Sequence, residues 1–327
     1  MAEETKRARE ELSDIYYEHH PPLKTDFLED LEWAWGGRWG VDTEVSRLRK
    51  VLLHRPGREI LAVEEPYEKW RYTHRPDLGE MQRDYETLRA AFEAEGVKVV
   101  ERLPEKGPEP RLVKSIYTRD PSFAVPGGVI VGRMYDRLRR GEEKYTMQTL
   151  AGIGCPVLRV VNGIGTVEGG SVMWLDPKHL AIGLSWRVNE EGARQVAEVV
   201  WSIDPEIEVD AEPIFHGHID EFICMVDVKT AVVDREGLAY SMYEWLMEDV
   251  GLNVIDRPQG LYVAGVAVRP GRIVCASGPG KEEGIKLLER NGIDVVPVEI
   301  PSLVEPRNSG SIHCLTMPVL RDPEPTC

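Results

Sequence analysis

From Val45 onward, the hydrophobic and polar positions of the chain follow one recurring pattern. A stretch with the periodicity of a helix ends at a Gly or Asp turn and is followed at once by a short apolar strand. This occurs five times, at residues 91–100, 150–160, 199–209, 246–255 and 287–296. Two strand-like runs joined by a tight turn precede the helix, most clearly at residues 122–132, 171–184, 222–233 and 262–275. The pattern predicts a β-β-α-β unit that is repeated five times.

A unit of this kind has one sheet face and one helix, and it cannot bury its apolar sides alone. Neighbouring units must therefore stack, and five units that close on themselves give a ring with pseudo-fivefold symmetry. A doubly wound α/β sheet is the competing fold, but it needs mostly single strands that alternate with helices. The paired strands favour the ring, and residues 45–327 are predicted to form it as one α/β domain.

Residues 1–44 do not share the repeat. Residues 5–17 have the pattern of a charged helix, and residues 26–39 are rich in Trp and are interrupted by Gly36 and Gly37. We predict an N-terminal extension that packs on the body of the protein or on a second subunit, which would give a homo-oligomer. A lid over an active site is the alternative interpretation.

Charge narrows the choice of partners. The chain has 327 residues, with 56 acidic against 40 basic side chains and a net charge of -16. This balance argues against a nucleic acid or an anionic membrane, and it favours small cationic substrates or simple solubility. There is no apolar run near ~18 residues and no apolar signal core at the N-terminus, so we expect a cytoplasmic protein. The five cysteines include no CxxC pair, which indicates reduced thiols.

Candidate chemistry gathers on the loops that leave the third strand of each unit. In a ring these loops start at equivalent places relative to the axis, so residues far apart in the sequence meet in one central pocket. The fourth unit offers only Gln259 and Gly260, whereas the other loops carry an acid, a histidine or a cysteine. The residues expected in the pocket are Asp120, Glu168, His218, Asp220 and Cys314.

Cys314 lies in a Ser/Gly-rich turn directly after His313, where a thiol is expected to face a cavity. Carboxylates raise the pKa of a nearby thiol, which is a poor arrangement for a nucleophile unless the substrate is a cation. A planar guanidinium matches pairs of carboxylates and would favour the thiolate as it binds. Attack on its central carbon would give a covalent amidino-cysteine, and His218 is the most credible proton carrier.

Six short motifs resemble those of a known superfamily. They are Val51–Gly57, Thr118–Pro121, Glu168–Gly170, Ile182–Arg187, His218–Asp220 and His313–Pro318. In this order they are similar to the guanidino-group modifying superfamily, which comprises arginine deiminases, dimethylarginine dimethylaminohydrolases, agmatine deiminases and amidinotransferases. The resemblance spans residues 45–321.

This resemblance implies a five-bladed α/β propeller, the pentein fold, with Cys314, His218 and Glu168 as catalytic residues. Cys314 would be the nucleophile and His218 the acid/base. Asp120 and Asp220, together with Glu168, would hold the guanidinium. The expected partner is therefore a small cationic guanidino substrate whose C–N bond is hydrolysed.

The exact substrate stays open on the same grounds. Arg133 and Arg187 look similar to arginines that bind the substrate α-carboxylate in arginine deiminases, which would make the substrate an amino acid. Ser171 stands where arginine deiminases usually have Asp, as it does in agmatine deiminases. Arginine, N-methylarginine and related guanidino compounds all fit this pattern.

Three other functions fit parts of the pattern. An amidinotransferase would pass the amidino group from arginine to an acceptor amine instead of water. His216 and His218 form the His-x-His of metal-dependent amidohydrolases, but the other histidines form no ligand pattern, so no metal and no other cofactor is expected. A ring-shaped binding protein would be expected to lack a nucleophile, and Cys314 argues against it.

Overall fold

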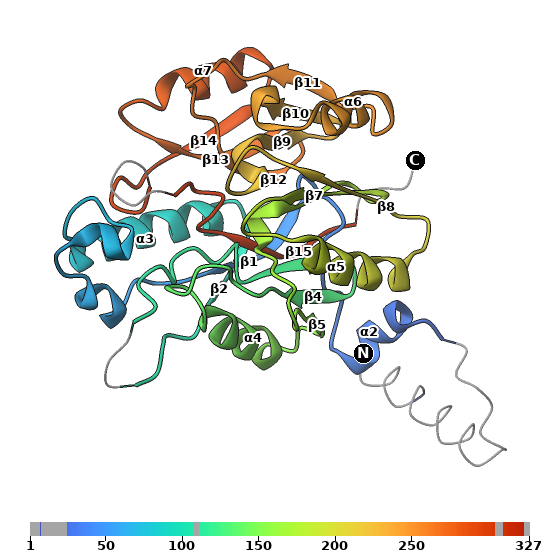
Figure 1. Cartoon of the computed structure of the whole chain (residues 1–327), viewed down its shortest axis with the longest axis horizontal. Helices are drawn as coiled ribbons and strands as arrows, with labels where there is room; N and C mark the ends of the chain where they lie inside the picture. The colour runs from blue at the N-terminus through green and yellow to red at the C-terminus, as the bar shows by residue number, and fades with distance from the viewer. Residues whose placement is uncertain (1–6, 8–24, 108–110, 305–309, 324–327) are drawn as a thin grey trace.

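The computed structural model describes residues 7, 25–107, 111–304 and 310–323. Their strands form five sheets of three strands each (Figure 1). In each sheet the central strand has an antiparallel neighbour on one side and a parallel neighbour on the other. With the central strand second, the sheets are β15–β1–β2 (Met317–Arg321, Leu48–Leu53, Lys98–Glu101), β3–β4–β5 (Ser122–Val125, Gly128–Val131, Val157–Val160), β6–β7–β8 (Val172–Asp176, His179–Leu184, Glu208–Pro213), β9–β10–β11 (Ile223–Asp227, Thr230–Val233, Asn253–Asp256) and β12–β13–β14 (Gly265–Arg269, Arg272–Ser277, Asp294–Glu299).

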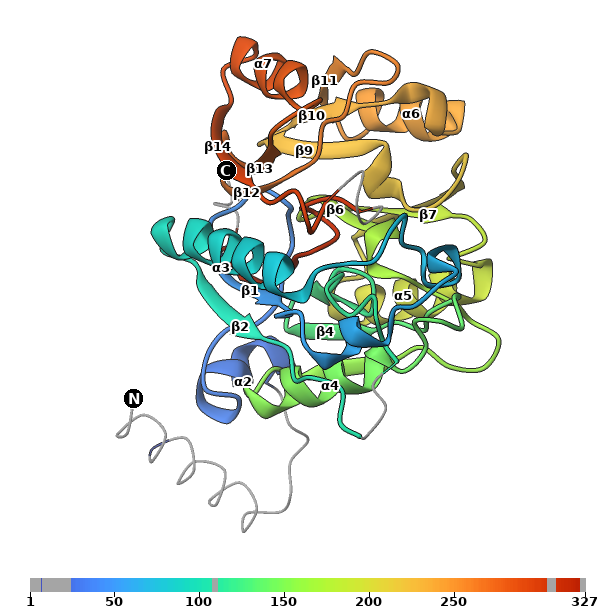
Figure 2. The same ribbon diagram turned by 90° about the vertical axis from the view of Figure 1, so that its left-hand side faces the viewer.

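A helix connects the central strand of each sheet to its parallel neighbour, because parallel strands need a long crossover. These helices are α3 (Leu78–Ala94), α4 (Glu142–Gly152), α5 (Glu190–Ile203), α6 (Tyr240–Glu248) and α7 (Glu282–Arg290). They lie at the periphery of the molecule, while the strands lie further inward (Figures 1 and 2). The mixed α/β architecture is confirmed, and the five small sheets fit the predicted repeated units. In the first sheet the antiparallel neighbour of β1 is β15, the last strand of the chain.

Turn and cap residues explain where several elements begin and end. β3 is joined to β4 at Gly127, and β12 to β13 at Gly271, with φ angles of 88° and 69°. Glycine adopts this left-handed backbone without a Cβ clash, so the hairpins close tightly. Asn189 precedes α5, and its side chain accepts a hydrogen bond from the N–H of Gly192.

The antiparallel neighbour is the inner strand of each sheet. β3, β6, β9, β12 and β15 are almost wholly buried, whereas the parallel neighbours keep exposed positions. β15 contacts β3, β12 contacts both β1 and β9, and β6 contacts η4 (Ile219–Glu221), the short 3-10 helix before β9. Apolar side chains from neighbouring sheets share core clusters, as Phe123, Trp174 and Met317 do. The inner strands therefore bring their preceding loops toward one another.

The N-terminal segment is described from residue 25 onward. α2 (Phe27–Ala34) buries Leu31 against the body, while the predicted helix at residues 5–17 lies outside the described part apart from residue 7. Further on, the N–H of Glu44 donates to the carbonyl of Trp174 in β6 at 3.2 Å. The end of the predicted extension thus packs into the body, and its boundary at residue 44 stays a prediction. In the described ranges, no helix has the length and apolar character needed to cross a membrane.

Candidate active site

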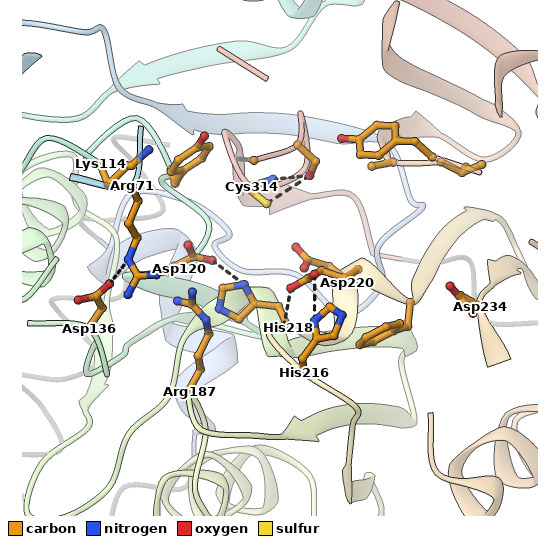
Figure 3. A pocket seen from close by; sticks show the side chains of 18 of the residues that line it. Arg71, Lys114, Asp120, Asp136, Arg187, His216, His218, Asp220, Asp234 and Cys314 are labelled. Atoms are coloured by element: carbon orange, nitrogen blue, oxygen red, sulfur yellow. Dashed lines mark hydrogen bonds and ion pairs between the residues drawn. The ribbon is translucent and has the colours of Figure 1, made fainter. Parts of the chain in front are cut away.

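One cavity of about 480 Å³ lies where the loops before the inner strands meet. Asp120 comes shortly before β3, Asp220 before β9, Tyr262 before β12 and Cys314 before β15, and all four line the cavity. His218, just before η4, lines it as well. Figure 3 shows Asp120, His218, Asp220 and Cys314 in the middle of this cavity. Residues that are far apart in the sequence therefore line one cavity.

Cys314 is held by the turn that contains it. Its Sγ lies 3.2 Å from the Oγ of Ser311, and its N–H donates to the same oxygen at 3.3 Å. Burial raises the pKa of the Cys314 thiol above its usual value, and the charges of Asp220 and Asp120 raise it further. The hydrogen bonds with Ser311 act in the opposite direction and are weaker. The thiol is therefore protonated at neutral pH.

His218 carries the opposite electrostatic bias. Its Nε2 lies 2.9 Å from Oε2 of Glu168, and its Nδ1 lies 3.7 Å from Oδ1 of Asp120. Burial disfavours the imidazolium, but the charges of Asp120 and Glu168 outweigh it and raise the pKa of His218 to about 9. At neutral pH the His218 ring is therefore protonated, and it lines the same cavity as Cys314.

Glu168 is wholly buried and does not itself line the cavity. Its Oε2 is shared between His218 and Nη1 of Arg187, the latter at 2.6 Å, and its Oε1 accepts from the N–H of Tyr135 at 2.9 Å. Burial opposes the ionised form, yet the hydrogen bond and charge of His218, with Arg187 beside them, hold the pKa of Glu168 well below its usual range. Glu168 is thus a fixed carboxylate that orients His218.

The arginines predicted to bind a carboxylate lie in different places. Arg187 lines the cavity while paired with Glu168. Arg133 does not line it, because its Nη1 donates to the carbonyl of Gly165 at 3.1 Å. Of the predicted site residues, Glu168 contacts the lining residues His218 and Arg187 without lining the cavity itself, Arg133 lies outside the lining, and the others line the cavity.

A third arginine, which the sequence analysis missed, contacts the site. Arg139 is buried, donates to Oδ2 of Asp120 and to the carbonyl of Tyr117, and pairs with Glu142. It lies in the segment Arg137–Arg140, and only its burial separates it from its neighbours. Charge spacing offered no signal that could have found it.

Both ends of the cavity carry further charged residues that sequence reasoning missed. At one end Arg71 pairs with Asp136 at 2.7 Å, and Lys114 lies on the same side (Figure 3). The Nζ of Lys114 is over the ring of Tyr72, which does not line the cavity. At the other end Arg257 pairs with Asp234. The cavity is therefore longer than a guanidinium alone, with charged groups of both signs at each end.

Asp120, Glu168 and His218 also form a group that could hold a metal ion, since one ligand atom of each lies within 4.8 Å of the others. Among the described ranges it is the one such group found. Arg139 and Arg187 already pair with its two carboxylates. Two adjacent positive charges oppose a divalent cation at this place, so the donor set fits hydrogen-bonded organic groups better than a metal.

We expect dialysis of the protein against a chelator to leave the turnover of guanidino compounds unchanged. His216, the second ligand of the metal alternative, does not belong to the three-residue group; it lies 3.4 Å from Glu221 instead. The measurement is turnover before and after dialysis, with metal analysis of the dialysed protein. Loss of turnover that zinc restores would support a metal-dependent mechanism instead.

Known sequences resemble this chain over its central part. The family model for arginine deiminase matches residues 109–256. The arginine deiminase of Oenococcus oeni is 26% identical over 254 residues, which are 63% of this chain and 60% of that protein. The N(G),N(G)-dimethylarginine dimethylaminohydrolase of Pseudomonas aeruginosa is 31% identical over 93 residues, or 28% of this chain and 36% of that protein. The chain thus matches less than two thirds of the length of these relatives.

Solved structures resemble it over most of its length. Dimethylarginine dimethylaminohydrolase from Pseudomonas aeruginosa, as a mutant complexed with citrulline, has a TM-score of 0.67 at 19% identity and covers 83% of this chain and 99% of that one. The inosamine-phosphate amidinotransferase of Streptomyces griseus has a TM-score of 0.64 at 18% identity, covering 86% and 96%. These structural similarities establish a common fold, and the family-model match adds a sequence similarity over residues 109–256. In sequence over its central part and in fold over most of its length, the chain is similar to the guanidino-group modifying enzymes, the penteins.

Proposed function

We propose that this chain is a hydrolase that cleaves a C–N bond of a guanidino substrate through a covalent intermediate on Cys314. One observation carries the proposal: the thiol lies among the carboxylates of Asp120 and Asp220, whose charges raise its pKa. Such a thiol becomes a nucleophile near neutral pH only when a cation enters. Each of these carboxylates has a buried Oδ1 with no hydrogen-bond partner among the described groups. A guanidinium supplies both the charge and the donors.

The first half-reaction forms the covalent intermediate. The bound guanidinium lowers the pKa of the Cys314 thiol, the thiol releases its proton to solvent, and Sγ attacks the central carbon to form a C–S bond. His218, protonated at the start, donates its proton to the departing nitrogen as the C–N bond breaks. Ammonia or an amine leaves, and the amidino group stays on the sulfur.

The second half-reaction returns the site to its starting state. His218, now neutral, accepts a proton from water, and the water oxygen attacks the amidino carbon. The C–S bond breaks, the thiolate of Cys314 takes up the proton of the added hydroxyl group, and the ureido product leaves with Cys314 again a thiol. Glu168 keeps the imidazole oriented throughout, since its Oε2 lies 2.9 Å from Nε2.

The end of the substrate away from the guanidinium is proposed to bind at Arg187. Arg187 lines the cavity with its Nε buried and unpartnered among the described groups, which supports an anionic head such as an α-carboxylate. Ser171 is wholly buried and outside the lining, so this departure from the arginine deiminase motif does not reshape the cavity wall directly. Arg133 is not needed for this assignment.

We further propose that residues 45–327 form the catalytic unit as a closed five-bladed propeller. Two features support closure: the last strand, β15, pairs with the first, β1, and contacts β3 of the next sheet. The loops before the inner strands would then face the axis, which accounts for a cavity built from residues so far apart in the chain.

The test is a panel of arginine, N-methylated arginines, agmatine, guanidino acids and an arginine–glycine pair. We expect a ureido product from at least one amino-acid guanidine, with release of ammonia or an amine. Transfer of the amidino group to glycine without ureido product would favour an amidinotransferase, an activity named for one of the structural neighbours. No product from any member of the panel would contradict the proposal.

A further inference from the structure

His313, which directly precedes Cys314, lies between two carboxylates. Its Nδ1 is 2.6 Å from Oδ2 of Asp220, a hydrogen-bond distance, and its Nε2 is 3.7 Å from Oε2 of Glu44, an ion-pair distance. All three side chains are buried. Asp220 faces the cavity, whereas Glu44 stands behind the imidazole and does not line the cavity. The three groups form a row that leads from the protein interior to the substrate site.

Glu44 is fixed at the back of this row by groups around the Cys314 turn. Its Oε1 accepts from Nη1 of Arg119 at 3.0 Å. Arg119 also donates from Nε to the carbonyl of Thr316, and from its N–H to the carbonyl of Cys314, at 2.9 and 3.2 Å. The carboxylate is therefore part of the frame that holds the nucleophile's backbone.

The charges that face His313 favour its protonated form. Burial and the positive charge of Arg119 lower its pKa, but the hydrogen bond to Asp220 and the ion-pair contact with Glu44 outweigh them, and the net shift is upward. Glu44 itself stays ionised: burial opposes this, yet Arg119, His313 and Arg321 hold its pKa well below the usual range. His313 thus faces two negative charges, on Asp220 and Glu44, and one positive charge, on Arg119, and this balance favours an imidazolium.

A second buried histidine in the same chain shows that a single carboxylate is not enough. His54 lies 3.1 Å from Glu59, again with both side chains buried. Burial is the largest influence there and, together with the charge of Arg102, it lowers the pKa of His54 despite the hydrogen bond to Glu59. His313 differs from His54 in having a second carboxylate, Glu44, beside its ring.

We propose that Glu44 is a positioning residue, which keeps His313 protonated so that the imidazolium holds Asp220 in place and offsets its charge beside the Cys314 thiol. The proposal rests on the proposed function, in which Cys314 attacks a guanidinium held by Asp220. Its reason is electrostatic: the charge of Asp220 raises the pKa of the thiol, and a cation on its far oxygen reduces that effect. Glu44 comes from the segment before the first repeat, so this segment takes part in the site.

The first test measures the charge on His313 directly. In protein labelled at the histidine ring carbons, the His313 resonance is assigned by its loss in His313→Gln and followed by NMR as pH rises. We expect an imidazolium at pH 7 in the unmodified protein, a lower pKa in Glu44→Gln, and a pKa close to the original in Glu44→Asp. A neutral His313 at pH 7 in the unmodified protein would overturn the proposal, and this result requires no turnover.

The second test uses the pH dependence of turnover, which a purely structural role would not change. Glu44→Gln should lose kcat as pH rises, because His313 becomes neutral where it is still charged in the unmodified protein. We expect a drop of about tenfold at pH 8, equal to one unit in the pKa of the thiol, and a return toward the original kcat at pH 6. KM should not rise, since Asp220 then meets no competing cation.

The matched control is Glu59→Gln, which removes the carboxylate of the buried Glu59–His54 pair; neither residue of this pair lines the cavity. It should lower the melting temperature while leaving the pH dependence of kcat unchanged.

A kcat deficit of equal size at every pH in Glu44→Gln, with the pKa of His313 unchanged, would contradict the proposal. If Glu44→Gln does not fold, Glu44→Asp and the titration of the unmodified protein still decide the matter. Absence of turnover in the unmodified protein would count against the proposed function, and the NMR titration would remain a separate result.

Discussion

Cys314→Ala is expected to give a folded protein that has lost turnover of guanidino compounds by at least about 10⁴-fold, the scale of removing a covalent nucleophile. The thiol is the only side chain of the proposed mechanism that forms a bond to carbon. Its neighbour Ser311 would remain in the cavity lining, but a hydroxyl group without an adjacent base is a much weaker nucleophile. The measurement is ureido product formation at saturating substrate, with circular dichroism and thermal melting to confirm the fold.

The control for this variant is Cys275→Ala in β13. Cys275 is a buried thiol whose pKa burial raises well above its usual value, and it does not line the cavity. Its loss removes one small buried side chain and should cost about 1 kcal/mol of stability, with turnover kept. Full activity in Cys314→Ala, or equal losses in both variants, would end the covalent mechanism.

The repeated unit could be predicted from the sequence because both of its periods are local. The hairpins have tight turns such as Gly127 and Gly271, and the helices end at Gly or Asp turns, so the boundaries of each unit can be recognised locally. The pairing of β15 with β1 has no such local signal, because β1 ends at Leu53 and β15 begins only at Met317, near the other end of the chain. It follows only once the units are assumed to stack around a centre.

The central site residues could be predicted for the same reason, and the missed ones show where the reasoning stops. Asp120, Asp220 and Cys314 all stand shortly before an inner strand. Counting back from the inner strand β12 would have found Tyr262, whereas the analysis of the fourth unit stopped at Gln259 and Gly260. Position relative to the inner strand was a better guide than residue type.

Arginine side chains were the hardest to place, because a long charged chain can point either way from the same backbone position. Arg133 was expected in the pocket on resemblance, but it donates to Gly165 instead. Arg139 is buried and bonded to Asp120, while Arg137 two residues earlier is exposed. Glu44 was assigned to an extension, yet it packs beside His313. Such choices depend on tertiary contacts that no local pattern records.

His218→Asn is expected to lower kcat by about 10³-fold, within the range that positioned acid–base groups contribute. The loss should fall mainly on the second half-reaction, in which neutral His218 takes a proton from water. With a substrate whose departing amine is weakly basic, the variant should accumulate the amidino-cysteine. Intact-protein mass spectrometry would detect it as an added mass that is absent in the double variant with Cys314→Ala.

The protonation of His218 also predicts how kcat/KM changes with pH. The pKa of His218 is raised to about 9, so the proton needed by the departing nitrogen is present below that pH and is lost as pH rises through it. The kcat/KM of the unmodified enzyme, which reports the free enzyme, should therefore fall as pH rises through 9, and His218→Asn should lack this limb. His179→Asn, which breaks a pair with Asp176 away from the cavity, should keep it. A descending limb that persists in His218→Asn would assign the proton donor to another group, since Asn cannot titrate in this range.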